Sequence, residues 1–392
     1  MYIQINMNKK SIIISLLLAT QLLPQLTIFF SDLCLLVATI LYGKYDKKIL
    51  IFFFPLLFLS VVIILFKDPV FYKLVLGSLR IFLLLNLASF VRDLSIHASK
   101  NIIKIISVII LVVTFSFNII GLFDVELYRE AINLWNGEHR TTSNNKLVSD
   151  IVAFERLSSF FPQPASSGFF HSFLLIFFFM IFLYTKNLLL ILVLIFVYLS
   201  GSLSKSSILH YFPAFYMAVY LYYNLLKNYK WQFTTLSLMP AFITILIFGF
   251  FANEDSFIYQ LTNQITGNRH LITGNHYIPF INFGVQEYLI GYSYEDLIQF
   301  RKPLGDSSIL TKLFIGGIFY YISFILFIIF SYFYLFKIYC KEKLDKFFFI
   351  LYFALMSFVE IGLTGYYQPQ ISVLSLLLLC LFLNFKNKKN YA

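Results

Sequence analysis

The order of apolar and polar segments along the chain predicts a polytopic membrane protein. Apolar runs of about 20 residues recur, and each is long enough to cross the roughly 30 Å hydrocarbon core of a bilayer. The runs are continuous and do not alternate with polar residues, so they are predicted to be helices and not strands of a barrel. The expected spans lie near 11–25, 27–43, 49–66, 74–91, 104–123, 166–185, 187–201, 206–226, 232–251, 308–336, 347–364 and 371–385. The predicted fold is therefore all-α, with about 12 transmembrane helices.

The distribution of Lys and Arg predicts the orientation of these helices. Of the 30 basic residues, 18 fall in segments expected in the cytoplasm: Lys9, Lys10, Lys44, Lys47, Lys48, Arg92, Lys100, Lys104, Lys186, Lys227, Lys230, Lys337, Lys341, Lys343, Lys346, Lys386, Lys388 and Lys389. The short outer loops hold only Lys67, Lys73 and Lys205. Both termini are thus expected to be cytoplasmic. Residues 11–43 also fit one long helix broken around Pro24, but that count would move Lys9 and Lys10 to the outer face.

Two long polar loops, about 124–165 and 252–307, interrupt this pattern, and the span count assigns both to the outer face. No internal repeat, coiled coil or soluble domain stands out, so residues 1–392 are predicted to form a single transmembrane domain. Lys9-Lys10 and the apolar run after them resemble a signal peptide. No small-residue cleavage site follows, and a retained first helix is expected.

Composition agrees with a membrane location and excludes several classes of function. Only 12% of the residues are charged and 59% are hydrophobic, whereas soluble chains contain about 25% charged residues. The net charge of +11 would suggest nucleic acid in a soluble protein, but here cytoplasmic lysines account for it. The three cysteines have no metal-binding or redox spacing.

Three charged residues fall within predicted spans: Asp32, Arg80 and Glu360. Charges at membrane depth are costly and commonly mark function. On the predicted topology each lies within about two helical turns of the outer surface. The structural alternative is snorkelling, or a buried ion pair that only orients helices.

Short motifs in the outer segments resemble one family. The first long loop ends in Arg156-Leu157-Ser158-Ser159-Phe160-Phe161-Pro162-Gln163-Pro164. This is similar to the Arg-x-Ser-Gly-x-Phe-x-Glu-Pro segment of bacterial O-antigen polymerases (Wzy-type) and the related ligases, with Ser159 in the Gly position and Gln163 in the Glu position. Ser202-Leu203-Ser204-Lys205-Ser206 resembles the family's Ser-x-Ser-Arg turn, with Lys205 in place of Arg.

The second long loop strengthens the resemblance. It contains Arg269 and His270 and closes with Asp306, before Gly316-Gly317 in the next helix. Ligases of this superfamily commonly have His in the position of Asp306, so the aspartate favours a polymerase. The resemblance implies joining of undecaprenyl-diphosphate-linked oligosaccharides, as donor and acceptor, at the periplasmic face of the bacterial inner membrane. It also implies membrane lipid, and a protein that sets chain length, as partners.

The residue types fit this chemistry. Departing diphosphate gains charge in the transition state, and Arg binds phosphate oxygens bidentately. Arg156 and Arg269 are predicted to clamp the diphosphate, and Lys205, Arg80 and Arg301 to assist. Alternatively, Arg156 only anchors its loop to lipid phosphates.

The acceptor hydroxyl needs a general base. Asp306 is favoured by position, followed by His270 or His276. Direct displacement would invert the anomeric centre. No Asp-x-Asp motif lies on the outer face, so a metal-independent reaction without cofactor is expected. Glu360 is a candidate substrate contact. The alternatives are that Asp306 is only a helix N-cap and that the two histidines are idle loop residues.

Three other functions compete with the polymerase. A ligase transfers finished polymer to lipid A-core. A lipid-linked oligosaccharide flippase also has about 12 spans, but it would be expected to have short loops and related halves. The third alternative is a membrane acyltransferase or sugar-modifying enzyme. The acyltransferase would be expected to contain a His-x-x-x-x-Asp pair, which is absent from the sequence.

Overall fold

The computed structural model describes a set of helices that belong to one bundle. It describes residues 12, 14–18, 30–42, 46–66, 72–136, 156–161, 164–205, 209, 220, 284–292, 308–342, 345–350, 352 and 374–390. The helices are α2 (Phe30–Tyr42), α3 (Lys47–Phe66), α4 (Tyr72–Val91), α5 (Ile96–Phe123), α6 (Val125–Asn136), α8 (Pro164–Thr185), α9 (Leu189–Ser202), α14 (Val285–Ile290), α16 (Ser308–Tyr339) and α18 (Ser375–Asn390). Within these residues the fold is entirely helical, as the sequence predicted.

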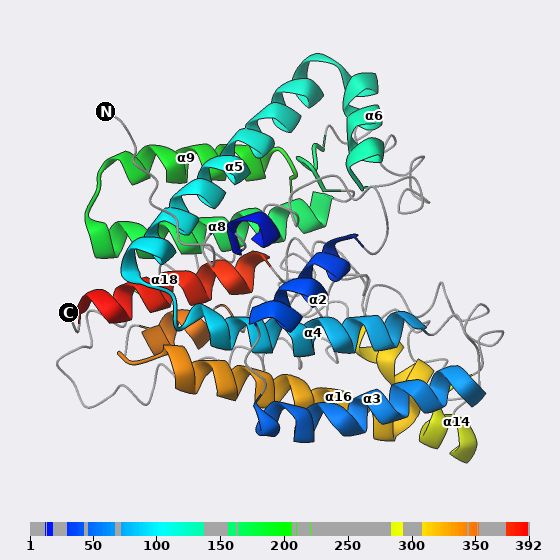
Figure 1. The fold of residues 1–392 in the computed structure, drawn as a ribbon. Coiled ribbons are helices and arrows are strands. Elements are labelled where there is room, and N and C mark those ends of the chain that lie inside the picture. The colour runs from blue at the N-terminus through cyan, green and yellow to red at the C-terminus, as the bar shows by residue number, and fades with distance from the viewer. Residues whose placement is uncertain are drawn as a thin grey trace, which may run out of the picture.

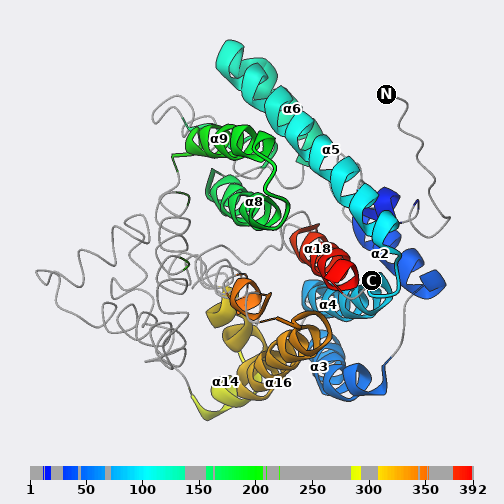
Figure 2. The same ribbon diagram turned by 90° about the vertical axis from the view of Figure 1, so that its left-hand side faces the viewer.

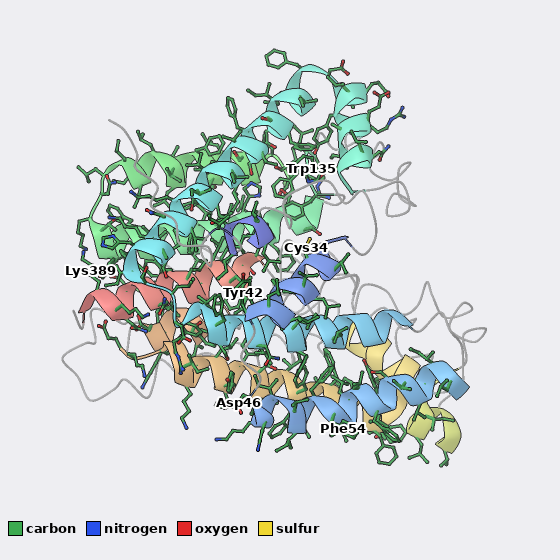
Figure 3. The ribbon with its side chains drawn as sticks, viewed as in Figure 1. Cys34, Tyr42, Asp46, Phe54, Trp135 and Lys389 are labelled. Carbon is green, nitrogen blue, oxygen red and sulfur yellow. The ribbon has the colours of Figure 1, made fainter. Side chains whose placement is uncertain are left out.

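Four of these helices are long and apolar enough to cross a membrane: Lys47–Leu65, Ile96–Phe123, Ser166–Thr185 and Gly316–Tyr339. Their outer faces carry large apolar side chains, whose exposure to water would be unfavourable. Phe54 of α3 is 65% exposed and projects away from the bundle, and Phe333 of α16 is 70% exposed (Figure 3). Apolar surface on this scale indicates a protein embedded in lipid. The predicted spans 206–226, 232–251 and 347–364 lie largely outside the described residues.

Helix α18 occupies the middle of the bundle. It contacts α4, α5, α8 and α16, and Figure 2 shows it between α8 and α4. Every described residue from Leu374 to Lys386 is buried. A helix that is apolar on all sides is expected in the interior of a bundle. On the outside, α3 packs against α16, and α8 packs against α9 (Figure 1).

A helix lies inside the first predicted polar loop. Asp124 ends α5 and caps α6, because its Oδ1 accepts a hydrogen bond of 2.9 Å from the N–H of Leu127. Helix α6 is amphipathic and buries Tyr128 and Ile132. The loop of about 124–165 therefore begins with a helix that the pattern of long apolar runs does not predict.

Helix boundaries differ from prediction where polar residues cap or bend the chain. Helix α5 begins eight residues before the predicted span at 104, because the Oγ of Ser95 accepts a hydrogen bond of 3.2 Å from Ala98 N–H. Helix α16 bends at Gly317, which has a φ of 68°. A Cβ at this position would lie 2.2 Å from the carbonyl oxygen of Leu289 in α14. Glycine is required there by both its backbone conformation and the close approach of α14.

Candidate functional site

The end of the first long loop and the end of α9 pack directly against each other. The N–H of Leu157 donates a hydrogen bond of 2.9 Å to the carbonyl oxygen of Leu203. The guanidinium of Arg156 donates from Nε to the carbonyl oxygen of Ser204, at 3.1 Å, and from Nη2 to that of Lys205, at 3.3 Å. The residues 156–161 and 203–205 therefore form one junction, called here the 156/205 junction.

The turn that ends α9 creates the acceptor side of this junction. Ser204 and Lys205 turn back on the helix, with backbone hydrogen bonds to Gly201 and Ser202 of 3.0 and 2.9 Å. Lys205 has a φ of 47°, the left-handed conformation that ends many helices. The carbonyl groups at a helix C-terminus carry partial negative charge, so a guanidinium is stabilised there. Arg156 thus caps α9 as well as holding its own loop.

Tyr128 of α6 holds the other side of the junction. Its phenol accepts a hydrogen bond of 2.7 Å from the N–H of Ser158 and donates one of 2.9 Å to the carbonyl oxygen of Ser159. The phenol and the Oγ of Ser158 are also 3.1 Å apart. Burial raises the pKa of Tyr128, so its hydroxyl stays protonated and remains a donor. Aromatic packing around Phe160, including Trp135 and Phe170, surrounds this network.

Ser159 has an unusual backbone conformation. Its φ is 53°, in the left-handed region that glycine adopts readily and other residues adopt at a cost. The side chain is buried, and among the described residues its hydroxyl has no hydrogen-bond partner. Glycine would adopt this φ at lower cost than serine.

A buried histidine lies next to the junction and was missed by the sequence analysis. His171 is fully buried in α8, and its Nδ1 lies 2.7 Å from the carbonyl oxygen of Ser167. That contact assigns the proton to Nδ1, and Nε2 has no partner among the described residues. A Cβ on Gly201 would lie 2.7 Å from the Cβ of His171, so α9 passes close to the imidazole. A polar residue in an apolar span was the available signal.

The structure brings together two of the predicted site residues, Arg156 and Lys205. Arg80 lies in α4, but its side chain is outside the described set, as is that of Asp32 in α2. The remaining predicted residues lie outside the described residues: Arg269, His270, His276, Arg301, Asp306 and Glu360.

The described part of the junction offers binding and positioning groups. Arg156 uses two of its five N–H donors on the carbonyl groups, and among the described residues the other three make no hydrogen bond. The described residues contain no group of three His, Cys, Asp or Glu side chains that could hold a metal ion. The arrangement can bind an anion through fixed cationic donors, and a base would have to come from another part of the chain.

Comparison with known proteins adds no family assignment. No protein-family model, curated protein or solved structure matches the chain.

Proposed function

We propose that the chain is an O-antigen polymerase of the bacterial inner membrane, with about 12 transmembrane helices and its active face toward the periplasm. The observation that carries this proposal is the 156/205 junction. Two short motifs that resemble the same family, 48 residues apart in sequence, pack together through the guanidinium of Arg156. This contact supports a shared function for the two segments.

The proposed reaction is glycosyl transfer between two lipid-linked repeat units. The acceptor hydroxyl attacks the anomeric carbon, a new glycosidic C–O bond forms, and the bond from that carbon to the diphosphate oxygen breaks. The base that accepts the hydroxyl proton is proposed to be Asp306, with His270 or His276 as alternatives. One displacement of this kind inverts the anomeric centre.

Arg156 and Lys205 are proposed to bind the departing diphosphate, with Arg269 completing the clamp. Because the diphosphate gains charge as the bond breaks, fixed cations stabilise the transition state more than the ground state. The two carbonyl contacts of Arg156 would hold its guanidinium in position before substrate binds.

The test is polymerisation by the purified full-length protein in lipid nanodiscs, with undecaprenyl-diphosphate repeat units as substrate. The wild type is expected to form ladders of polymer. Arg156→Ala should reduce the rate by roughly 10²–10³-fold, the usual effect of removing one transition-state donor. Arg156→Lys should retain part of the rate, because it keeps the charge and loses the bidentate geometry.

Arg129→Ala is the matched control. Arg129 lies in α6, one residue from Tyr128, and forms an exposed ion pair of 2.8 Å with Glu126. Its loss should leave the ladders unchanged. Wild-type rates from a folded Arg156→Ala protein would refute the clamp. Transfer of finished polymer to lipid A-core would indicate the ligase, and lipid translocation without polymer would indicate the flippase.

A further inference from the structure

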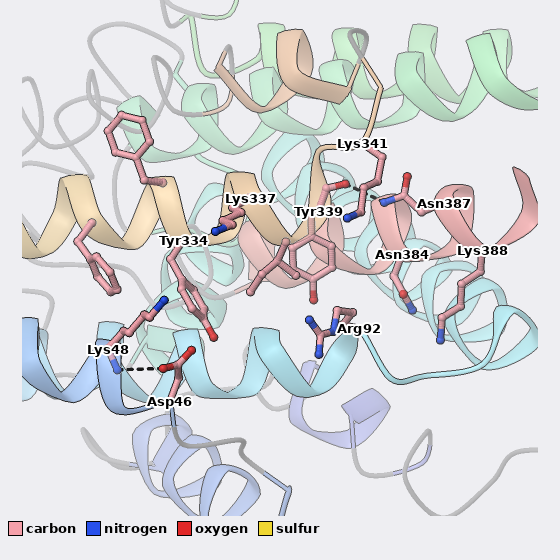
Figure 4. Close-up of a pocket in the computed structure, with 13 residues that line it drawn as sticks. Asp46, Lys48, Arg92, Tyr334, Lys337, Tyr339, Lys341, Asn384, Asn387 and Lys388 are labelled. Carbon is pink, nitrogen blue, oxygen red and sulfur yellow. Dashed lines mark hydrogen bonds between the residues drawn. The ribbon is translucent and has the colours of Figure 1, made fainter. Parts of the chain in front are cut away.

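A cavity of about 650 Å³ lies among the ends of α3, α16 and α18 and the turn that follows α4 (Figure 4). It is distinct from the 156/205 junction and shares no residue with it. Its lining contains five cationic side chains and a single carboxylate, that of Asp46. The five cations come from four different parts of the chain: Lys48, Arg92, Lys337, Lys341 and Lys388.

The positive charge of the cavity is only partly compensated. Asp46 accepts a hydrogen bond of 2.9 Å from the backbone N–H of Lys48. Outside the lining, Asp93 lies 3.8 Å from the Nε of Arg92, and both side chains are exposed. Neither Lys337 nor Lys341 forms an ion pair within the described part of the chain. Like charges held close together repel, and a bound anion would relieve that repulsion.

The polar inner wall of the cavity is held in place by hydrogen bonds. Asn387 donates a hydrogen bond of 2.7 Å to the carbonyl oxygen of Tyr339. Asn384 donates to the carbonyl oxygens of Val91 and Leu94 at 3.0 and 3.2 Å, and the Nζ of Lys388 donates to that of Leu94 at 2.6 Å. These contacts join α18 to α16, to the end of α4 and to the turn after α4, so the site does not have to be assembled when a ligand binds.

The opposite wall is apolar and continues onto the membrane-facing surface. Phe330 lines the cavity and stacks on Phe52 of α3, with ring centroids 4.2 Å apart. Phe333 also lines it and is 70% exposed. The exposed apolar faces of α3 and α16, which include Ile51 and Leu326, extend from this wall. A soluble anion would use only the cationic side, whereas a lipid would use both.

We propose that this cavity binds the phosphate headgroup of an anionic phospholipid, with the acyl chains lying along α3 and α16. Basic pockets between transmembrane helices on the cytoplasmic side recognise such headgroups. The cations of the cavity belong to segments whose Lys and Arg content predicts the cytoplasmic side. The proposal is independent of the polymerase activity.

The test uses full-length protein in neutral detergent and native mass spectrometry to count bound lipid. Dioleoyl phosphatidylglycerol is expected to bind at least roughly tenfold more tightly than dioleoyl phosphatidylcholine. Each basic residue near an anionic headgroup strengthens binding by roughly fivefold, and the cavity holds five such residues. The double variant Lys337→Gln/Lys341→Gln should weaken phosphatidylglycerol binding on the order of tenfold. Lys100→Gln/Lys104→Gln removes two exposed lysines from the first half of α5 and is the control.

Selective binding that only the cavity variant weakens supports the proposal. Equal binding of the two lipids overturns it, and so does an equal loss in the control, which would mean a general surface-charge effect. A third arm adds glycerol 3-phosphate to the lipid-free protein. If this soluble phosphate binds as tightly as phosphatidylglycerol, the site recognises a soluble anion and the lipid assignment is wrong. Thermal unfolding of each variant confirms that it is folded.

Discussion

The Nε of Arg156 donates a hydrogen bond of 3.1 Å to the carbonyl oxygen of Ser204, 48 residues further along the chain. This contact joins the end of the first long polar loop to the C-terminal end of α9. It gives Arg156 a structural role that can be measured separately from catalysis.

Arg156→Ala is expected to lower the free energy of unfolding by about 1.5–3 kcal/mol, the usual range for hydrogen bonds from a charged donor. The carbonyl groups of Ser204 and Lys205 would lose their donor. Chemical denaturation in detergent measures the change. Arg129→Ala should lower it by less than about 0.5 kcal/mol, since it removes only an exposed ion pair on one helix. Equal losses would argue against the cap.

Tyr128→Phe should destabilise the 156/205 junction without changing the apolar packing of α6. The buried N–H of Ser158 would lose its acceptor, which costs about 1–3 kcal/mol. Thermal unfolding and hydrogen exchange at Ser158 would measure this. Tyr321→Phe is the control, because the phenol of Tyr321 makes no hydrogen bond among the described residues. Unchanged exchange at Ser158 would contradict the assigned network.

Ser159→Gly is expected to stabilise the protein by about 0.5–1 kcal/mol. Relief of the left-handed conformation, worth about 1–2 kcal/mol, exceeds the entropic cost of glycine in the unfolded chain, about 0.5–1 kcal/mol. Ser158→Gly, at the adjacent position, should instead destabilise, because the Oγ of Ser158 donates a hydrogen bond of 2.5 Å to the carbonyl oxygen of Phe161. Equilibrium unfolding measures the change in unfolding free energy, which should be positive for Ser159→Gly and negative for Ser158→Gly. The same sign for both variants would contradict the left-handed conformation of Ser159.

Lys386→Met should destabilise the end of α18 by about 3–5 kcal/mol, because it leaves Asp345 buried without its cation. Glu342 also pairs with this lysine, at 2.7 Å. The double variant Lys386→Met/Asp345→Asn should recover much of the loss. A double-mutant cycle with no coupling energy would contradict a buried ion pair.

The same ion pair predicts a dependence of stability on pH. Burial by itself would lower the pKa of Lys386, but hydrogen bonds from the ammonium to Asp345 and Glu342 outweigh burial and raise it. A raised pKa in the folded state means that the stabilisation is complete below pH 10.5 and is lost as the pH rises further. The unfolding free energy of Lys386→Met should therefore fall less steeply above that pH than that of the wild type.

Gly317→Ala should disrupt the packing of α14 on α16. The added Cβ would lie 2.2 Å from the carbonyl oxygen of Leu289, and alanine does not readily adopt a φ of 68°. A loss of at least about 2 kcal/mol is expected from backbone strain and the clash together. Limited proteolysis should show faster cleavage near residues 285–290. Ser323→Ala, in the same helix, is expected to leave both measurements unchanged.

The apolar pattern predicted most of the described helices closely. Helices α3, α4, α8 and α9 lie within a few residues of their predicted spans. The pattern succeeds because transfer of a long apolar segment into lipid is determined by that segment alone. It missed α6, because α6 is amphipathic and is stabilised by Asp124 at its start and by packing of Tyr128 and Ile132.

Residue type alone predicted Arg156 and Lys205 as phosphate-binding residues, because fixed cations on polar loops suit phosphate. Their meeting at one junction depends on how α8 and α9 pack after the turn at Lys186 and Asn187. The environment of the His171 Nε2, which has no hydrogen-bond partner among the described residues, likewise depends on neighbours that are distant in sequence.

The sequence by itself determined that the chain forms apolar helices suited to a membrane, and the distribution of its basic residues predicts how those helices are oriented. Both properties arise from local composition, since each apolar run and each lysine interacts with lipid or water independently of the rest. Only the tertiary structure decided that Arg156 caps α9, that Ser159 adopts a left-handed backbone conformation, and that five cationic side chains line one cavity. These relationships depend on which helix ends meet, and packing between segments far apart in the chain decides that.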